Sequence, residues 1–199
     1  MMVKPVALLL CAGEGTRMKD QRTNKVCYEV AGIPAVIRSI NNMQAAGIDQ
    51  FMVVVGSKSE KVMECLAGIP GVTYAYQPQQ LGTGNAAMCG LKQLCAFGYH
   101  GPVLIAMGDK IISSDVIHGL IERYNEQTQA PVFAVQPKDF NPSGGRICIK
   151  DGKVCGIYEM LDSMLLCLSD VADKTEKGFN EALCRFDISP KKKQKLILS

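Results

Sequence analysis

Short apolar runs alternate with amphipathic stretches along the first two thirds of the chain. Apolar runs of strand length predict buried strands at residues 6–10, 51–55, 72–76, 103–107 and 132–135. Apolar residues at helical spacing predict intervening helices from Pro34 to Gly47, from a Ser57–Glu60 capping box to Gly68, up to Leu94, and from Ser114 to Tyr124. This alternation is typical of an α/β fold in which a mostly parallel central sheet is covered by helices on both faces.

The pattern changes after Pro137. Two strand-like runs, 146–149 and 154–158, flank an Asp151-Gly152 pair, which is a strong signal for a tight hairpin turn. Residues 161–173 are consistent with a helix or an irregular crossover, and residues 180–187 with a closing strand. We therefore expect a single domain over residues 1–199, made of an α/β body (1–137) and a small antiparallel β insertion with its closing strand (138–199).

Composition narrows the class of protein. With 199 residues, 47% of them hydrophobic, the chain can bury a core, which excludes disordered and collagen-like proteins. The net charge of +3 depends on four lysines among the last nine residues, and the other charges nearly cancel, so we expect no nucleic-acid partner. The first apolar run is too short to span a membrane, and no membrane partner is expected. Nine cysteines, with no C-x-x-C pair, predict reduced, buried thiols in a cytoplasmic protein.

Three loops that follow predicted strands carry the candidate chemistry, because the carboxyl ends of parallel strands meet at one edge of a sheet. The first loop, residues 10–18, has Gly13 and Gly15, which let the main chain approach an anion, and Arg17, which can grip a phosphate through two donors. Met18 departs from the dinucleotide-binding fingerprint, and the Gly-Lys-Ser/Thr of a Walker A loop is absent from the sequence.

The second loop, residues 77–85, has amides that can read the edge of a base, although a polar turn is the alternative. The third contains Gly108-Asp109, where the carboxylate is either a helix cap or an oxygen ligand for Mg²⁺. Together the loops predict a site for a nucleoside triphosphate and a divalent ion. His100 and His118 are expected outside it, in a turn and on an exposed helix face.

These motifs resemble those of the sugar-1-phosphate nucleotidyltransferases, in particular the uridyltransferase domain that makes UDP-N-acetylglucosamine. The family pattern L-x-A-G-x-G-T-R-M with a following lysine is similar to residues 10–18 and Lys25, Q-x-x-Q-L-G-T-G to residues 77–84, and G-D to residues 108–109. Weaker likenesses lie at residues 141–147, 159 and 180–187. The resemblance covers essentially the whole chain and implies the Rossmann-like fold of nucleotide-diphospho-sugar transferases.

The resemblance also implies a role for each matching residue. It makes Arg17 and Lys25 catalytic groups on the triphosphate, Asp109 the ligand of a Mg²⁺ cofactor, and Gln77 the reader of the base. The nucleotide-binding residues that it implies are Leu10, Cys11, Ala12, Gly13, Gly15, Thr16, Gln77, Gln80, Gly82, Thr83 and Gly108, and the implied sugar contacts are Gly145, Glu159 and Asn180. The expected reaction joins UTP to N-acetylglucosamine 1-phosphate with release of pyrophosphate.

Departures from the family pattern keep alternatives open. Asn24 stands where the family generally has proline, Lys25 lies one residue further from Arg17 than usual, and the glycine segment at Ser143 is one residue short. The segment that supplies a second metal-binding residue in the family would follow the last residue, so we expect a chain truncated at its C-terminus. A nucleotide-binding regulatory module, a glycosyltransferase of similar fold and assembly as a homo-oligomer are the open alternatives.

Overall fold

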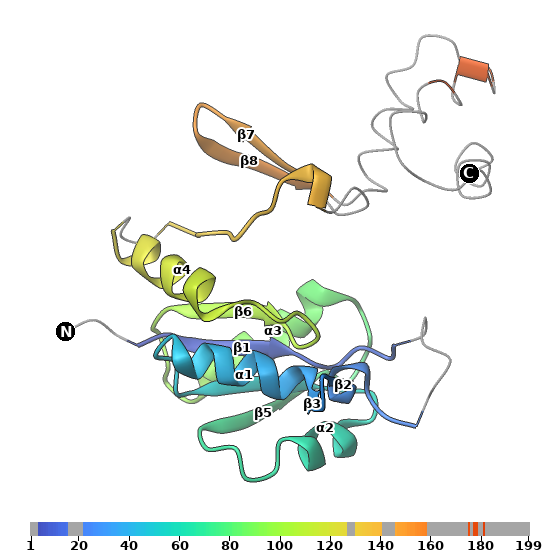
Figure 1. The fold of residues 1–199 in the computed structure, drawn as a ribbon, viewed down its shortest axis with the longest axis vertical. Coiled ribbons are helices and arrows are strands. Elements are labelled where there is room, and N and C mark those ends of the chain that lie inside the picture. The colour runs from blue at the N-terminus through green and yellow to red at the C-terminus, as the bar shows by residue number, and fades with distance from the viewer. Residues whose placement is uncertain are drawn as a thin grey trace. The chain divides into compact units, whose positions relative to one another are not determined.

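The structure is a computed structural model that describes residues 4–15, 22–126, 130–140, 146–158, 175, 177–178 and 181. The chain divides into two compact units, residues 1–134 and residues 135–199. Figure 1 shows the first unit as a sheet with helices packed against it. The predicted segment 161–173 lies outside the described residues, as does the segment 180–187 apart from Glu181.

A four-stranded parallel sheet forms the centre of the first unit. Its strands are β1 (Val6–Leu10), β4 (Phe51–Val55), β5 (Val72–Tyr76) and β6 (Val103–Met107), in the order β5-β4-β1-β6. These bounds confirm the four longer predicted strands. Leu10 is in register with Val54 on one side and with Met107 on the other, so the carboxyl ends of the strands meet at one edge.

Helices cover both faces of this sheet, as the alternation of patterns predicts. Three helices share a core with inward-facing residues such as Leu9 and Val53: α1 (Ala35–Ala45), α2 (Ser59–Cys65) and α4 (Ser114–Glu126). Helix α3 (Thr83–Ala96) packs on the opposite face against Leu8 and Val54. Figure 1 shows α1 across the near face of the sheet and α3 behind it. Successive strand residues point to opposite faces, which is why one strand serves both cores.

Two local predictions are wrong. The Ser57–Glu60 capping box does not form: α2 begins at Ser59, after Lys58 in the left-handed region at φ 55°, and no side chain caps it. The main chain of Ser57 is engaged elsewhere, because its N–H donates to the Ala12 carbonyl and its carbonyl accepts from Asn24. Residues 132–135 form no strand, since a strand needs a neighbour for its hydrogen bonds and no described residue pairs with this segment.

Two hairpins complete the described structure. In the second unit, β7 (Arg146–Lys150) and β8 (Lys153–Tyr158) pair antiparallel around Asp151 and Gly152, both at positive φ, as the Asp-Gly signal predicts. A 3-10 turn, η2 (Lys138–Phe140), precedes them. In the first unit, a 3-10 turn η1 (Lys25–Cys27) leads to a short hairpin of β2 (Glu29–Val30) and β3 (Ile33–Pro34), which the sequence patterns do not predict.

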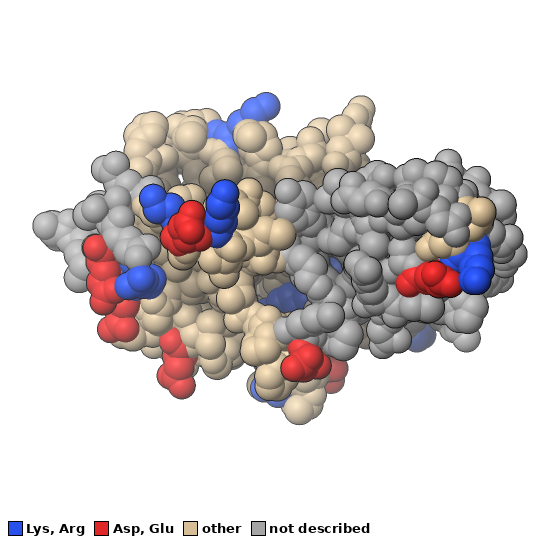
Figure 2. Space-filling model, turned by 90° about the horizontal axis from the view of Figure 1, so that it is seen from above, with Lys and Arg blue, Asp and Glu red and all other residues tan. Residues whose placement is uncertain are grey.

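Residue exposure and surface charge test the predictions made from the composition. Of the seven described cysteines, all are free but only Cys11 is buried, so the expectation of buried thiols is wrong for exposed positions such as Cys95 and Cys148. On the face drawn in Figure 2, the described acidic and basic side chains lie interspersed, in keeping with a body whose charges nearly cancel. Among the described residues, every helix is too short or too polar to cross a membrane.

Candidate functional site

The loops after β1 and β6 are in direct contact at the carboxyl edge of the sheet. The Gly108 N–H donates to the Leu10 carbonyl at 3.0 Å, and this bond extends the pairing of the two strands. A Cβ atom on Gly108 would overlap the Cys11 sulfur, so only glycine allows the two loops to approach this closely. The close approach places Asp109 next to the glycine loop, as the motifs predict.

The loop after β5 joins the same edge. A Cβ atom on Gly56, at the end of β4, would lie 2.6 Å from the Gln80 amide nitrogen and 3.1 Å from the Ala12 carbonyl oxygen, so Gln80 packs beside the first loop. Gln77 is buried, and its amide donates to the Gly82 carbonyl at 3.2 Å and to the Asn85 side chain at 2.8 Å. Gln77 therefore stabilises the loop between β5 and α3 through hydrogen bonds to that loop and to the first turn of α3.

The central feature of the site is an ion pair between Lys25 and Asp109. The Lys25 ammonium lies 2.9 Å from Oδ2 of Asp109, and both side chains are about 70% buried, with 28% and 30% of their surface exposed. The aliphatic part of Lys25 runs alongside Gly13 and Gly15, where a side chain would meet it at 3.8 and 3.7 Å. Lysine, aspartate and the glycine loop thus form one cluster from three separate stretches of sequence.

One carboxylate oxygen of Asp109 has no partner in the part of the chain that the structure describes. Its Oδ1 is buried and accepts no hydrogen bond from the described residues, an arrangement that is costly and uncommon in folded proteins. A carboxylate oxygen is a ligand that Mg²⁺ prefers, and Mg²⁺ is commonly held by one or two carboxylates together with substrate phosphates. The described residues contain no cluster of three or more acidic, histidine or cysteine side chains that could hold a metal ion.

Cys11 lies against this cluster without the properties of a nucleophile. Burial, and then the negative charge of Asp109, raise the pKa of the Cys11 thiol to about 12, although Lys25 acts in the opposite direction. The thiolate is the reactive form of cysteine, and at neutral pH Cys11 stays protonated. Its sulfur instead fills the space that Gly108 leaves open.

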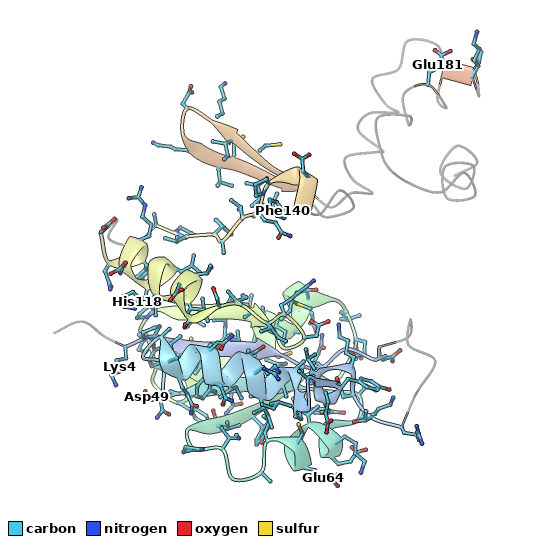
Figure 3. The ribbon with its side chains drawn as sticks, viewed as in Figure 1. Lys4, Asp49, Glu64, His118, Phe140 and Glu181 are labelled. Carbon is cyan, nitrogen blue, oxygen red and sulfur yellow. The ribbon has the colours of Figure 1, made fainter. Side chains whose placement is uncertain are left out.

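The structure describes only some of the other candidate residues. Thr16, Arg17, Gly145, Glu159 and Asn180 fall outside the described residues. His118 is exposed on α4 and pairs with Glu122 at 3.2 Å, which confirms the expectation of an exposed helix face (Figure 3). An apolar pocket of about 450 Å³ lies along β6, α4 and residues 131–134, and Lys25, Asp109 and the glycine loop take no part in its lining.

Sequence reasoning missed one residue at this edge, Asn24. It is 2% exposed, it precedes Lys25, and its side chain contacts the loops after β1 and β4. The sequence carries a signal at this position, namely an asparagine where the resembled family generally has proline, but that signal alone assigns no partner to the amide.

A parallel sheet that gathers a glycine loop, an amide loop and a lysine–aspartate pair at its carboxyl edge defines an α/β domain of the nucleotide-binding class. Residues 7–170 match the model of the MobA-like NTP transferase domain, and the chain belongs to this family. This match confirms the family resemblance that the motifs indicate.

Curated relatives are similar over most of this chain. The bifunctional protein GlmU of Acetivibrio thermocellus is 38% identical over 186 residues, which are 92% of this chain and 38% of the relative. GlmU of Geotalea daltonii is 36% identical over 165 residues, 81% of this chain and 35% of the relative. The chain therefore spans somewhat more than a third of the length of these relatives.

Solved structures confirm the fold class. A UDP-glucose pyrophosphorylase from Acinetobacter baumannii superposes with a TM-score of 0.61 at 18% identity, and the match covers 91% of this chain and 81% of that one. A nucleotidyl transferase from Methanothermobacter gives a TM-score of 0.51 at 22% identity, over 60% and 57% of the two chains. At these identities the likeness bears on the fold, which is the predicted Rossmann-like arrangement.

Proposed function

We propose that the protein transfers a nucleotidyl group from a nucleoside triphosphate, UTP, to a sugar 1-phosphate, N-acetylglucosamine 1-phosphate. A phosphate oxygen of the sugar 1-phosphate attacks the α-phosphorus of UTP. A new P–O bond forms, the bond between the α-phosphorus and the oxygen bridging to the β-phosphorus breaks, and pyrophosphate leaves. The observation that carries the proposal is the Lys25–Asp109 pair where the loops meet, with one carboxylate oxygen that has no partner among the described residues.

The cluster suits this reaction because the chemistry needs charge compensation more than acid–base catalysis. The attacking phosphate oxygen is already ionised at neutral pH, so the protein has to align two anions and offset their repulsion. Lys25 supplies a positive charge beside the glycine loop, where the main chain of residues 11–15 can approach a triphosphate. Arg17 would add a second positive charge from the same loop.

Asp109 is the proposed ligand of Mg²⁺. Its buried Oδ1, which has no partner among the described residues, fits a cation with a preference for oxygen. On binding, the cation would take the place of Lys25 beside Asp109, and the polyphosphate would take the place of Asp109 beside Lys25. When bound, Mg²⁺ would neutralise the triphosphate and the charge that develops on the departing pyrophosphate.

The substrates are proposed from relatives. The motif resemblance of residues 10–18 and 77–84 to the uridyltransferase domain that makes UDP-N-acetylglucosamine supports a uridine nucleotide and an amino-sugar phosphate. Proteins named GlmU are among the relatives that match this chain. On this proposal Gly82 and Thr83 hold the base from the loop after β5, and Gly145, Glu159 and Asn180 contact the sugar. Gln77, expected to read the base, would act by holding the Gly82 carbonyl in place.

The proposal is tested by following pyrophosphate release from purified protein supplied with UTP, N-acetylglucosamine 1-phosphate and MgCl₂. We expect turnover that EDTA abolishes and that falls when another triphosphate or glucose 1-phosphate is substituted. Asp109→Asn should lower the rate by on the order of a hundredfold, the scale of losing one charge-stabilising group. Asp49→Asn is the matched control, since Asp49 is also paired with a lysine but lies at the other edge of the sheet, and it should keep the wild-type rate.

Other outcomes identify the two alternative functions. Saturable UTP binding without pyrophosphate release, whatever the sugar phosphate, would replace the proposal with a nucleotide-binding regulatory module. Transfer of a sugar from a nucleotide-sugar donor, with release of a nucleoside diphosphate, would indicate a glycosyltransferase.

A further inference from the structure

Asn24 is one of three buried polar residues in the described structure, and it lies next to Lys25 of the candidate site. It immediately precedes Lys25, and its side chain is enclosed by the ends of β1 and β4 and by the turn η1. A buried amide is retained only where its hydrogen-bonding groups are satisfied. The hydrogen-bond partners of the Asn24 amide therefore identify the segments that this side chain connects.

The amide nitrogen of Asn24 is shared by three main-chain carbonyls. It lies 3.1 Å from the Cys11 oxygen and 3.4 Å from the Gly13 oxygen, both in the loop after β1. It lies 3.0 Å from the Ser57 oxygen, in the loop after β4. Because an amide nitrogen has two hydrogens, the two short contacts are full hydrogen bonds and the third is a weaker one.

The amide oxygen faces the other way, into η1. It accepts the Val26 N–H at 3.2 Å, and the Asn24 carbonyl accepts the Cys27 N–H at 3.0 Å, so Asn24 is the N-cap of the turn that carries Lys25. One side chain thus joins the loop after β1, the loop after β4 and the lysine turn.

We propose that Asn24 is a positioning residue that sets the place of the Lys25 ammonium relative to the glycine loop and Asp109. The inference rests on the proposed function for its catalytic consequence, but the linkage itself is independent of any substrate. Lys25 follows the clamped residue directly, and its stem runs along Gly13, whose carbonyl Asn24 also contacts. Among the described residues of this turn, Asn24 alone has a side chain that joins η1 to both loops.

The chemistry of the linkage distinguishes asparagine from its close replacements. Aspartate keeps an oxygen for the Val26 N–H but places a carboxylate against three carbonyl oxygens. Proline fits the observed φ of −77°, but it has neither donor nor acceptor in its side chain. Alanine removes both ends of the linkage. A role in joining the loops therefore requires Asn24→Asp to be as harmful as Asn24→Ala, whereas a role in capping alone would make Asn24→Asp mild.

The first arm of the test is a double-mutant cycle on pyrophosphate release. Asn24→Ala and Asn24→Asp should each lower kcat/KM by roughly tenfold or more, because small misplacement of a catalytic group is costly. In a Lys25→Ala background the same substitutions should change kcat/KM less than about twofold, since the residue acts through Lys25. Asn42→Ala, which removes a 2.8 Å bond from an amide on α1 to the Ile112 carbonyl, is the matched control and should be neutral. Equal losses in both backgrounds, or a mild Asn24→Asp, would overturn the inference.

The second arm is hydrogen exchange in the absence of substrate, which separates this inference from the proposed function. Asn24→Ala should accelerate exchange of the Val26, Cys27 and Ser57 amides by about tenfold or more, since these N–H groups depend on the linked loops. Amides of α3 should keep their wild-type rates. If wild-type protein shows no turnover but these amides respond, the linkage stands and the proposed function fails. If turnover is present and these amides do not respond, the inference fails.

Discussion

The sheet carries a lysine–aspartate pair at each of its two edges. At the amino edge, Lys4 and Asp49 precede β1 and β4 and form a 2.7 Å ion pair with 69% and 56% of the two side chains exposed (Figure 3). At the carboxyl edge, Lys25 and Asp109 form a pair of similar length, 2.9 Å, with less than a third of each side chain exposed. The two pairs therefore differ in environment much more than in geometry.

The difference in environment predicts different roles for the two pairs. Water solvates the amino-edge pair, and such exposed pairs contribute little to stability. At the carboxyl edge the charges are partly desolvated, one carboxylate oxygen has no described partner, and glycines at 13 and 108 bring main chain close to the pair. A folded protein retains an unsatisfied buried oxygen at a cost, and a ligand that satisfies it offsets that cost.

The largest expected effect is on turnover. Lys25→Ala should lower the rate of pyrophosphate release by on the order of a hundredfold, because it removes a positive charge from a partly desolvated site. Lys4→Ala removes the same type of charge from the amino edge and should stay within about twofold of wild type. The rates are measured at saturating substrates. Comparable losses of rate for the two variants would show that the two ion pairs do not differ in their importance for turnover.

The second effect is on stability. Gly108→Ala forces a methyl group onto the Cys11 sulfur and should lower the free energy of unfolding by about 1–3 kcal/mol, as overpacking does. Gly119→Ala on α4 meets nothing within 4 Å and should raise it by up to about 1 kcal/mol, because alanine favours helix. Urea denaturation of the two variants measures both changes. A neutral Gly108→Ala would mean that the loops can separate freely.

The third effect is a loss of stability at alkaline pH. The pKa of Cys11 is about 12 in the folded protein, above the ordinary thiol value of 9.0, so folding holds the proton on sulfur. The unfolded chain loses that proton as pH rises past 9, and stability should fall by roughly 1 kcal/mol by pH 10. Below pH 9 both the folded and the unfolded state keep the proton, so the full stability is present there. Denaturation of wild type and Cys11→Ala at pH 7 and pH 10 isolates this residue, and parallel pH profiles would contradict it.

The smallest effect is expected at the amino edge. The hydrogen bond from Lys4 lowers the pKa of Asp49, so this residue contributes stability only above the unfolded carboxyl pKa, and the contribution disappears as pH falls through the lower folded value. Solvent screening keeps the effect small, and Asp49→Asn should shift the melting temperature by less than about 2 °C at pH 7. A larger shift would indicate that this pair is also a structural centre.

The parts of the fold that depend on local pattern were predictable. The four apolar runs became β1, β4, β5 and β6 with the predicted bounds, and Asp151-Gly152 turned the predicted hairpin. Predictions that depend on a distant partner were less reliable. Residues 132–135 have the composition of a strand, but no described residue pairs with them. Ser57 is of a residue type that caps helices, but its main chain bonds to Ala12 and Asn24 instead.

The sequence by itself determined the strands and the order of the loops along the chain, because these follow from periodicity and residue type. Its motifs also resemble one family pattern that contains both Lys25 and Asp109. Only the tertiary structure decided that the two side chains meet at 2.9 Å, that Asp109 keeps a buried oxygen without a described partner, and that Asn24 links two loops to the lysine turn. Such contacts join residues far apart in sequence, and they form only when parallel strands bring their carboxyl ends together.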